Sequence, residues 1–220
     1  MVNVYGVALH LKLLRSNSFY IEDYLPLSSA LENSPYLPQM ILAFDTYYFD
    51  GSAKTACLAF GHWADAVPLG LYSETLTGIE AYQSGEFYKR ELPCILSLLH
   101  KMQLQENPEA IIVDGFVYLD DHGKNGLGAH LYEALQGQVP VLGVAKTNFA
   151  SVEENKRHVL RGQSLRPLYI TAIGITLEEA ALLIENMHGA YRIPTLLKML
   201  DSLSRAQGAP SEGLAPYTEF

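Results

Sequence analysis

Long apolar runs, paired cysteines and a positive net charge are all missing from this chain of 220 residues. No stretch approaches the roughly 18 consecutive apolar residues that a membrane-spanning helix needs. The N-terminal region also lacks the basic start and small-residue cleavage site of an export signal. We therefore expect neither a membrane span nor secretion.

The chain has only two cysteines, Cys57 and Cys94, and neither belongs to a CxxC pair. Each is flanked by apolar residues, so both are most simply buried thiols without a disulfide partner. A reducing compartment suits such thiols. We expect a cytoplasmic protein.

Basic residues are few, with 15 Lys and Arg against 24 Asp and Glu and a net charge of −9. This balance excludes a global attraction to nucleic acid or to anionic membrane, so any polyanion must meet a local patch. The densest basic stretch is Lys156-Arg157-His158-Val159-Leu160-Arg161, with Arg166 following. It predicts either a solvated face or a patch that contacts phosphates.

Apolar residues are abundant, at 49% of the chain against 18% charged residues. That composition and length predict one globular domain with a large core. We expect this domain to span residues 1–206. Residues 207–220, rich in Gly, Pro and Ser, are expected to form a flexible tail.

The first half of the chain predicts an antiparallel meander followed by a helix. Residues 39–49 and 54–61 are apolar runs separated by the turn sequence Asp50-Gly51-Ser52, which indicates a hairpin. Residues 66–72 offer a third strand. Apolar positions recur at helical spacing through residues 84–105 and predict a long helix.

Strands and helices alternate in the second half, which predicts parallel neighbouring strands in a covered sheet. Thr176 is expected to cap one of these helices, with Glu179 at the capping-box position. The whole pattern predicts an α/β fold, a mixed sheet with helices on both faces as in ribonuclease H-like proteins. The expected strands are residues 110–113, 139–144 and 168–173, and the expected helices are 127–135, 177–187 and 194–204.

Three carboxylates stand where apolar elements disfavour them. Asp45 interrupts one apolar strand, Asp114 ends another, and Glu91 lies early in the long helix. Singly, each has an ordinary explanation: a turn at Asp114-Gly115, a solvent-facing edge for Asp45, a helix surface for Glu91. A carboxylate at such a place is otherwise costly unless it is paired, hydrogen-bonded or bound to a metal. Together, acids on neighbouring elements suit Mg²⁺ or Mn²⁺.

Six ordered blocks between residues 43 and 194 resemble the endonuclease V family. The most specific part is Arg-Glu-x-Pro, followed by Val-Asp-Gly, a Gly-x-x-His-Leu helix and Gly-Val-Ala-Lys. In chain order the blocks are AFDTYYFDGSAKTACLAF, AYQSGEFYKRELPCIL, AIIVDG, GLGAHL, VPVLGVAK and YRIP.

The resemblance implies a ribonuclease H-like fold and a metal-dependent endonuclease that recognises deoxyinosine in DNA, or inosine in RNA, and cuts on its 3′ side. It implies that Asp45, Glu91 and Asp114 hold the metal, Mg²⁺ or Mn²⁺ as a substitute. It places Lys146 near the scissile phosphate and Tyr82 in the loop that wedges into the duplex.

Four further residues are candidates for substrate contact by the same resemblance. Gly115 would let the backbone come close to the substrate. His130 matches a family histidine, although a packed helix histidine is the more frequent meaning of such a residue. His122 either replaces a lost family histidine or is a solvent-facing turn residue, and Lys124 lies in the same loop.

Two departures from the family concern the substrate. The wedge Pro-Tyr-Ile-Pro is here Ala81-Tyr82-Gln83-Ser84, and a basic loop after Val-Asp-Gly is here Phe116-Val117 followed by residues 119–124, which include Asp120 and Asp121 and make the loop acidic. The retained acids favour an active nuclease. The departures keep open a catalytically inactive nucleic-acid-binding protein, or a nuclease shifted to single-stranded DNA or RNA. Aromatic residues could stack on bases, although core packing explains most of them: Tyr47, Tyr48, Phe87 and Tyr88.

Overall fold

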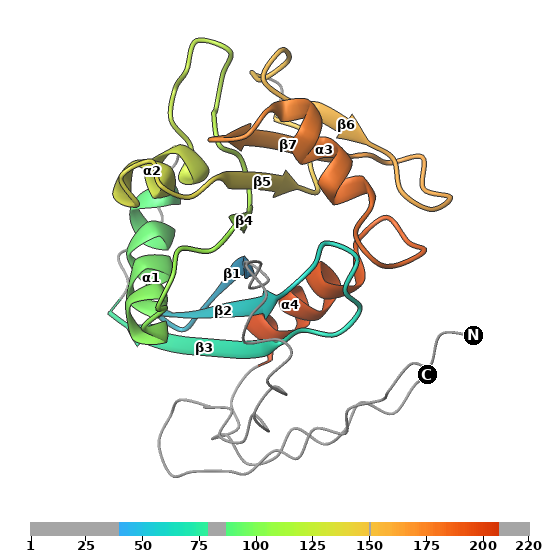
Figure 1. The fold of residues 1–220 in the computed structure, drawn as a ribbon. Coiled ribbons are helices and arrows are strands. Elements are labelled where there is room, and N and C mark those ends of the chain that lie inside the picture. Colours follow the sequence, from blue (N-terminus) through green and yellow to red (C-terminus); the bar gives the residue numbers. More distant parts are fainter. Residues whose placement is uncertain (1–39, 79–86, 150, 207–220) are drawn as a thin grey trace, which may run out of the picture. The chain divides into compact units, whose positions relative to one another are not determined.

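A mixed sheet of seven strands forms the centre of the computed structural model, which describes residues 40–78, 87–149 and 151–206 (Figure 1). The strand order is β3-β2-β1-β4-β5-β7-β6. The expectations for residues 1–38, for residues 207–220 and for Tyr82 lie outside the described residues. The strands are β1 (Ile41–Phe49), β2 (Ser52–Phe60), β3 (Gly70–Thr77), β4 (Ala110–Asp114), β5 (Val141–Ala145), β6 (Arg157–Val159) and β7 (Leu168–Ile173), and the helices are α1 (Phe87–Met102), α2 (Leu127–Ala134), α3 (Leu177–Glu185) and α4 (Thr195–Arg205).

The antiparallel meander is confirmed. β1 and β2 form a hairpin in which Phe49 pairs with Ser52. Asp50 and Gly51 both have positive φ, 44° and 70°, which is the backbone of a tight hairpin turn that matches the twist of its strands. β3 then pairs antiparallel with β2.

The third strand begins later than the sequence pattern predicted, at Gly70 instead of Ala66. The Asp65 carboxylate accepts hydrogen bonds from the backbone N–H groups of Gly61 (3.0 Å) and His62 (2.8 Å). This local turn holds the chain in a loop that the apolar residues alone did not reveal. Pairing with β2 resumes only where the N–H of Leu69 donates to the carbonyl of Ala59, at 2.7 Å.

The central strands are parallel, as the alternation predicted. β4 lies between β1 and β5 and runs parallel to both. β7 differs, because it pairs antiparallel with β5. In its described residues, the connection from β5 to β7 contains the short strand β6 and no helix, so it does not make the crossover that a parallel partner requires.

Helices cover both faces of the sheet, so the fold is the predicted ribonuclease H-like α/β fold. Alternate strand residues point to opposite faces. One face packs against α1 and α2, and the other against α3 and α4, and Figure 1 shows the two pairs on opposite sides. The predicted cap of α3 is also present, since the Thr176 side chain accepts the N–H of Glu179.

As a whole, the basic stretch of residues 156–161 is neither a solvated face nor a phosphate-contacting patch, because its cationic side chains bind other parts of the protein. Lys156 is only 3% exposed and donates to the side chains of Asn148 (2.8 Å) and Glu153 (3.1 Å). Arg161 is also buried, and Arg157 pairs with Glu178. The Arg161 guanidinium donates to the backbone carbonyls of Glu185, Met187, Gly189 and Tyr191.

Cys57 and Cys94 are buried and unpaired, as predicted. Among the helices in the described part of the chain, none is both long and apolar enough to cross a membrane.

Candidate active site

Strand register brings two of the predicted acids side by side. β1 pairs with β4 so that Phe44 lies opposite Val113, and the next residues along the two strands are Asp45 and Asp114. β5 pairs with β4 so that Val144 lies opposite Asp114, and Lys146 follows β5 immediately. Parallel strands end at the same edge of a sheet. Asp45, Asp114 and Lys146 therefore meet at one edge.

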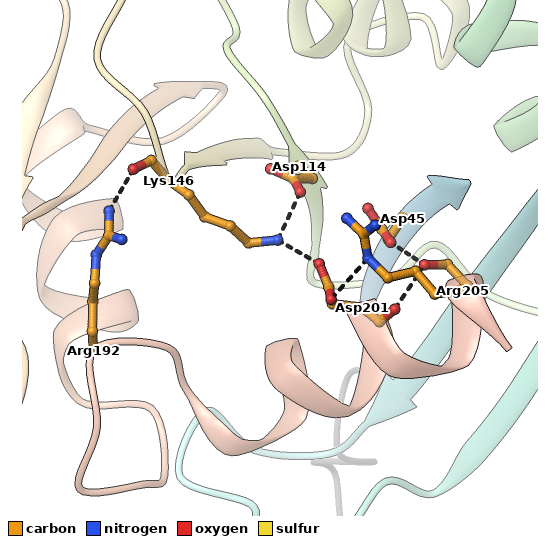
Figure 2. A network of polar contacts seen from close by, with 7 residues as sticks. Asp45, Asp114, Lys146, Arg192, Asp201 and Arg205 are labelled. Carbon is orange, nitrogen blue, oxygen red and sulfur yellow. Dashed lines mark hydrogen bonds and ion pairs between the residues drawn. The ribbon is translucent and has the colours of Figure 1, made fainter. Parts of the chain in front are cut away.

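Helix α4 crosses this edge and adds Asp201. Asp45, Asp114, Lys146 and Asp201 together line a pocket whose other walls are apolar. Figure 2 shows the Lys146 side chain reaching toward both Asp114 and Asp201. The apolar lining consists of Phe44, Ile112, Val113, Val144, Leu168, Ile193, Leu197 and Leu200.

Lys146 links two of the acids. Its Nζ lies 3.1 Å from Asp114 Oδ2 and 2.7 Å from Asp201 Oδ1. Burial lowers the pKa of Lys146, but the hydrogen bonds and charges of Asp201 and Asp114 outweigh burial and leave this pKa above its ordinary value. Burial alone would raise the pKa of Asp201. Its contacts with Lys146 and Arg205 outweigh burial, so this pKa is lowered.

A residue of α4 forms a hydrogen bond with Asp45. The buried Ser204 hydroxyl donates to Asp45 Oδ2. Burial raises the pKa of Asp45, the Ser204 hydrogen bond opposes this rise, and the charges of Asp114 and Asp201 add to it. The net result is a raised pKa, so the fold disfavours the ionised form of this acid.

Glu91 is the most deeply buried acid of the group, with only 2% of the residue exposed. Burial is the main cause that holds its pKa well above the usual range, and the charges of Asp45 and Asp114 raise this pKa further. Its Oε2 has no hydrogen-bond partner among the described residues. This buried carboxylate has an oxygen without a hydrogen-bond partner and lies near two more acids, so a bound cation would stabilise its charged form.

The donor set fits a hard divalent cation by its chemistry. The candidate ligands are all carboxylate oxygens, which Mg²⁺ and Mn²⁺ prefer. The positions of the described side chains, in contrast, do not form a metal site. Within residues 40–78, 87–149 and 151–206, no three His, Cys, Asp or Glu side chains lie close enough together to hold a metal ion.

The remaining substrate-contact candidates occupy different surroundings. Gly115 has φ of +145°, which favours glycine, and a Cβ there would meet open space. His122 and Lys124 are exposed in the loop that follows β4. His130 stacks on Tyr88 of α1, with ring centroids 3.8 Å apart, and lies 3.6 Å from Glu133. The contacts of His130 therefore join α1 to α2.

The acids of the loop after β4 act as backbone acceptors. Asp120 Oδ1 accepts from the N–H groups of His122 and Lys124, both at 2.9 Å. The Asp121 carboxylate accepts from the N–H groups of residues 153, 154 and 155, at 2.9–3.1 Å. These hydrogen bonds, led by those from Lys124 and Asn155 respectively, hold the pKa of both carboxyls below the ordinary value.

Sequence analysis missed the residues that α4 contributes: Asp201, Ser204 and Arg205. Spacings of three and four residues place them on neighbouring parts of one helix face. Arg205 Nε lies 3.1 Å from Asp201 Oδ2 and so braces it. The signal in the sequence was a set of polar residues at this spacing next to Leu200. The same pattern is found on the solvent-facing side of an ordinary helix.

The fold and the carboxylates at its shared strand edge define a class: the α/β domains with a ribonuclease H-like sheet. The family model described as Endonuclease V matches residues 25–202, which is most of the chain. The chain therefore belongs to the endonuclease V family. Membership places it among nucleases, hydrolases that act on nucleic acid.

Solved structures of similar fold include other members of that family. Endonuclease V of Ciona intestinalis, in complex with a 24mer DNA containing an inosine followed by a ribo-adenosine, is 18% identical with a TM-score of 0.64, covering 76% of this chain and 84% of that chain. The catalytic domain of human endonuclease V is 22% identical with a TM-score of 0.62, covering 76% and 81%. The Streptomyces avermitilis protein is 23% identical with a TM-score of 0.59, covering 79% and 84%. No curated protein matches the chain.

Proposed function

We propose that this protein is a metal-dependent endonuclease that hydrolyses a phosphodiester near deoxyinosine or inosine, in nucleic-acid repair or processing. The observation that carries the proposal is geometric: strand register places Asp45 beside Asp114, and α1 adds the buried Glu91, whose Oε2 has no hydrogen-bond partner among the described residues. Family membership supports the nuclease class. The inosine-containing DNA in the Ciona complex supports the choice of base for this chain.

Asp45, Glu91 and Asp114 would hold Mg²⁺, or Mn²⁺ in its place, and Asp201 is a further carboxylate in the pocket that Asp45 and Asp114 line. When bound, such an ion activates water and offsets charge on the phosphate. Ser204 would keep one Asp45 oxygen oriented through its hydrogen bond. The cost of ionising the buried Glu91 would be offset by the cation's charge.

Lys146 would neutralise charge on the scissile phosphate. Its side chain is 37% exposed and its Nζ lies at the strand end beside Asp114. Arg192 donates to the backbone carbonyl of Lys146 and to that of Pro167, which fixes the start of the lysine side chain at the strand end (Figure 2). A lysine placed in this way acts as a point donor to a phosphate oxygen.

A catalytically inactive nucleic-acid-binding protein is the second candidate, and one observation favours it. Lys146 already neutralises Asp114 and Asp201, and no described group of acids stands ready to hold a metal. On this alternative the lysine would replace the metal as the counter-charge of the site. Cleavage decides between the two functions, because a cleft can bind a metal without cutting.

The proposed partner is nucleic acid, DNA or RNA that contains inosine. The proposed location is the cytoplasm, and two buried, unpaired cysteines support it because a reducing compartment keeps them free.

The test is cleavage of end-labelled oligonucleotides, single- and double-stranded, DNA and RNA, each with and without one inosine, in Mg²⁺ and in Mn²⁺. We expect metal-dependent cutting near inosine, lost in Asp45→Asn and kept in Asp50→Asn. Asp50 is a matched control because it is exposed at the tip of the same hairpin, where asparagine also accepts positive φ. If the folded protein cuts none of these substrates in either metal, the inactive binding protein is the better description.

A further inference from the structure

Thr46 follows the candidate ligand Asp45 on β1 and points to the other face of the sheet. Successive residues of a strand point to opposite faces. Asp45 points to the face of α4, where it accepts the Ser204 hydroxyl, so Thr46 points to the face of α1. There its hydroxyl forms a hydrogen bond with the Glu91 carboxylate. The residue next to one candidate metal ligand therefore contacts another.

A second hydroxyl, on β2, supports the Thr46 hydroxyl. Thr46 and Thr55 are direct partners in the register of β1 and β2, and their Oγ1 atoms lie 2.9 Å apart. Thr55 is only 1% exposed, so its hydroxyl is shielded from water. Each hydroxyl has one proton to donate. When Thr46 donates to the ionised Glu91, Thr55 is the donor to Thr46, so the hydrogen bonds run in one direction, from β2 through β1 to α1.

The contact with Thr46 leaves part of the Glu91 carboxylate unsatisfied. Glu91 Oε2 has no hydrogen-bond partner among the described residues. Glu91 is also not part of the lining of the pocket that Asp45 and Asp114 share, so contacts outside this pocket set its position. A glutamate side chain samples several rotamers unless a partner holds it. The hydrogen bond from Thr46 restricts this freedom at the carboxylate itself.

We propose that Thr46 is a positioning residue of the metal site: supported by Thr55, its hydroxyl keeps the Glu91 carboxylate in place and leaves Oε2 to a divalent cation. The inference rests on the proposed function for the presence of the cation. Hydrogen bonds that orient metal-binding side chains typically change metal affinity by about 10- to 100-fold. On this proposal Thr46 acts only through Glu91, and Thr55 acts only through Thr46.

Threonines that face each other on antiparallel strands also form ordinary stabilising pairs, so the test measures metal binding separately from stability. The probe is Mn²⁺ alone, titrated into the folded protein without nucleic acid and followed by the electron paramagnetic resonance of the free ion. Valine keeps the branched shape of threonine without the hydroxyl, and serine keeps the hydroxyl. The variants are Thr46→Val, Thr46→Ser and Thr55→Val, and the control is Thr75→Val, at an exposed position of β3.

We expect Thr46→Val to weaken Mn²⁺ binding about 10-fold or more, and Thr46→Ser to keep most of the affinity. Thr55→Val should weaken binding about 2- to 10-fold, because it removes only the donor to Thr46. Thr75→Val should change nothing. In a Glu91→Ala background, Thr46→Val should have little further effect, because no carboxylate is left to position. Thermal unfolding establishes that each variant is folded, and if Thr46→Val is not, Thr55→Val decides.

The positioning role is wrong if Thr46→Val binds Mn²⁺ as tightly as the wild-type protein or more tightly, or if serine does not preserve binding. It is also wrong if Thr46→Val costs as much affinity in the Glu91→Ala background as in the wild-type chain, or if the wild-type protein binds no Mn²⁺. Failure of the proposed hydrolysis looks different, because the dependence of Mn²⁺ binding on Thr46 and Glu91 would persist without any cleavage. Conversely, cleavage whose Mn²⁺ requirement is indifferent to Thr46 would keep the nuclease and remove the positioning role.

Discussion

Two groups of acids in this protein have opposite electrostatics. Burial and the charges of nearby acids raise the pKa of Asp45 on β1 and that of Glu91 on α1. In the loop just after β4, backbone N–H groups lower the pKa of Asp120 and Asp121. The fold disfavours the charged form of the first pair, whereas its backbone donors favour the charged form of the second pair.

The difference shows that a count of acidic residues does not give their function. The sequence of a loop with several acids suggests that it repels a phosphate backbone. The carboxylates of Asp120 and Asp121, however, accept hydrogen bonds from backbone N–H groups of their own loop and of a neighbouring loop. An acid whose ionisation the fold disfavours is instead a candidate for cation binding. The partners of each carboxylate therefore separate a functional acid from a structural one.

The largest expected effect separates the two groups by activity. Asp45→Asn should reduce cleavage by about 100-fold or more, because it removes a negative ligand oxygen from the site. Asp120→Asn should leave cleavage nearly unchanged, because the asparagine oxygen still accepts the two loop N–H groups. Single-turnover cleavage of the inosine substrate measures both. Equal losses in the two variants would mean that the grouping by pKa has no functional content.

Glu91→Gln should sharpen the comparison through stability. A raised folded pKa means that the unfolded chain ionises Glu91 first, so stability falls as the pH rises from the ordinary value of 4.5 through the folded pKa. Without metal at neutral pH, the variant should therefore be more stable by about 1–3 kcal/mol. For a chain of this size that is about 2–10 °C in the midpoint of thermal unfolding.

Mg²⁺ supplies the control for this prediction. It should raise the thermal midpoint of the wild-type protein and have a smaller effect on Glu91→Gln, because the variant lacks one ligand charge. A variant that is less stable than wild type at neutral pH, and equally responsive to Mg²⁺, would show that Glu91 is structural.

Lys146→Met tests the lysine as a counter-charge, with a smaller effect. The folded pKa of Lys146 is raised, so its contribution to stability is fully present below 10.5 and is lost as the pH rises through the folded pKa. Because the pair is partly exposed, the loss at neutral pH should be about 1 kcal/mol or less. Urea unfolding at pH 7 and above pH 10.5 measures it. A difference that grows with pH would contradict the assignment.

Local patterns in the sequence predicted most of the sheet and all four helices, because apolar periodicity reports which face is buried. They misplaced the start of β3, which a hydrogen-bonded turn at Asp65 sets. They also missed β6, since its three residues include Arg157 and His158 and carry no apolar run.

The residues of the candidate site were also only partly predictable, because local patterns do not report long-range contacts. Asp45, Glu91 and Asp114 were visible as acids within or at the end of apolar elements, whereas Lys146 gained its role through the family resemblance. Asp201 was missed because an acid on an amphipathic helix looks solvent-facing. Only the packing of α4 across the strand edge turns it toward Lys146, and such a long-range contact leaves no mark in local periodicity.

The smallest expected effect lies in the loop acids and concerns local opening instead of global unfolding. Asp121→Ala should expose the N–H groups of residues 153–155 to faster hydrogen exchange, because their shared acceptor is gone. Asp120→Ala is the matched control, since it should affect only the N–H groups of His122 and Lys124. The lowered pKa of Asp121 means that its contribution is present above the ordinary value of 3.8 and is lost as the pH falls through the folded pKa, so acid should mimic Asp121→Ala. If residues 153–155 exchange equally fast in both variants, Asp121 does not hold the two loops together.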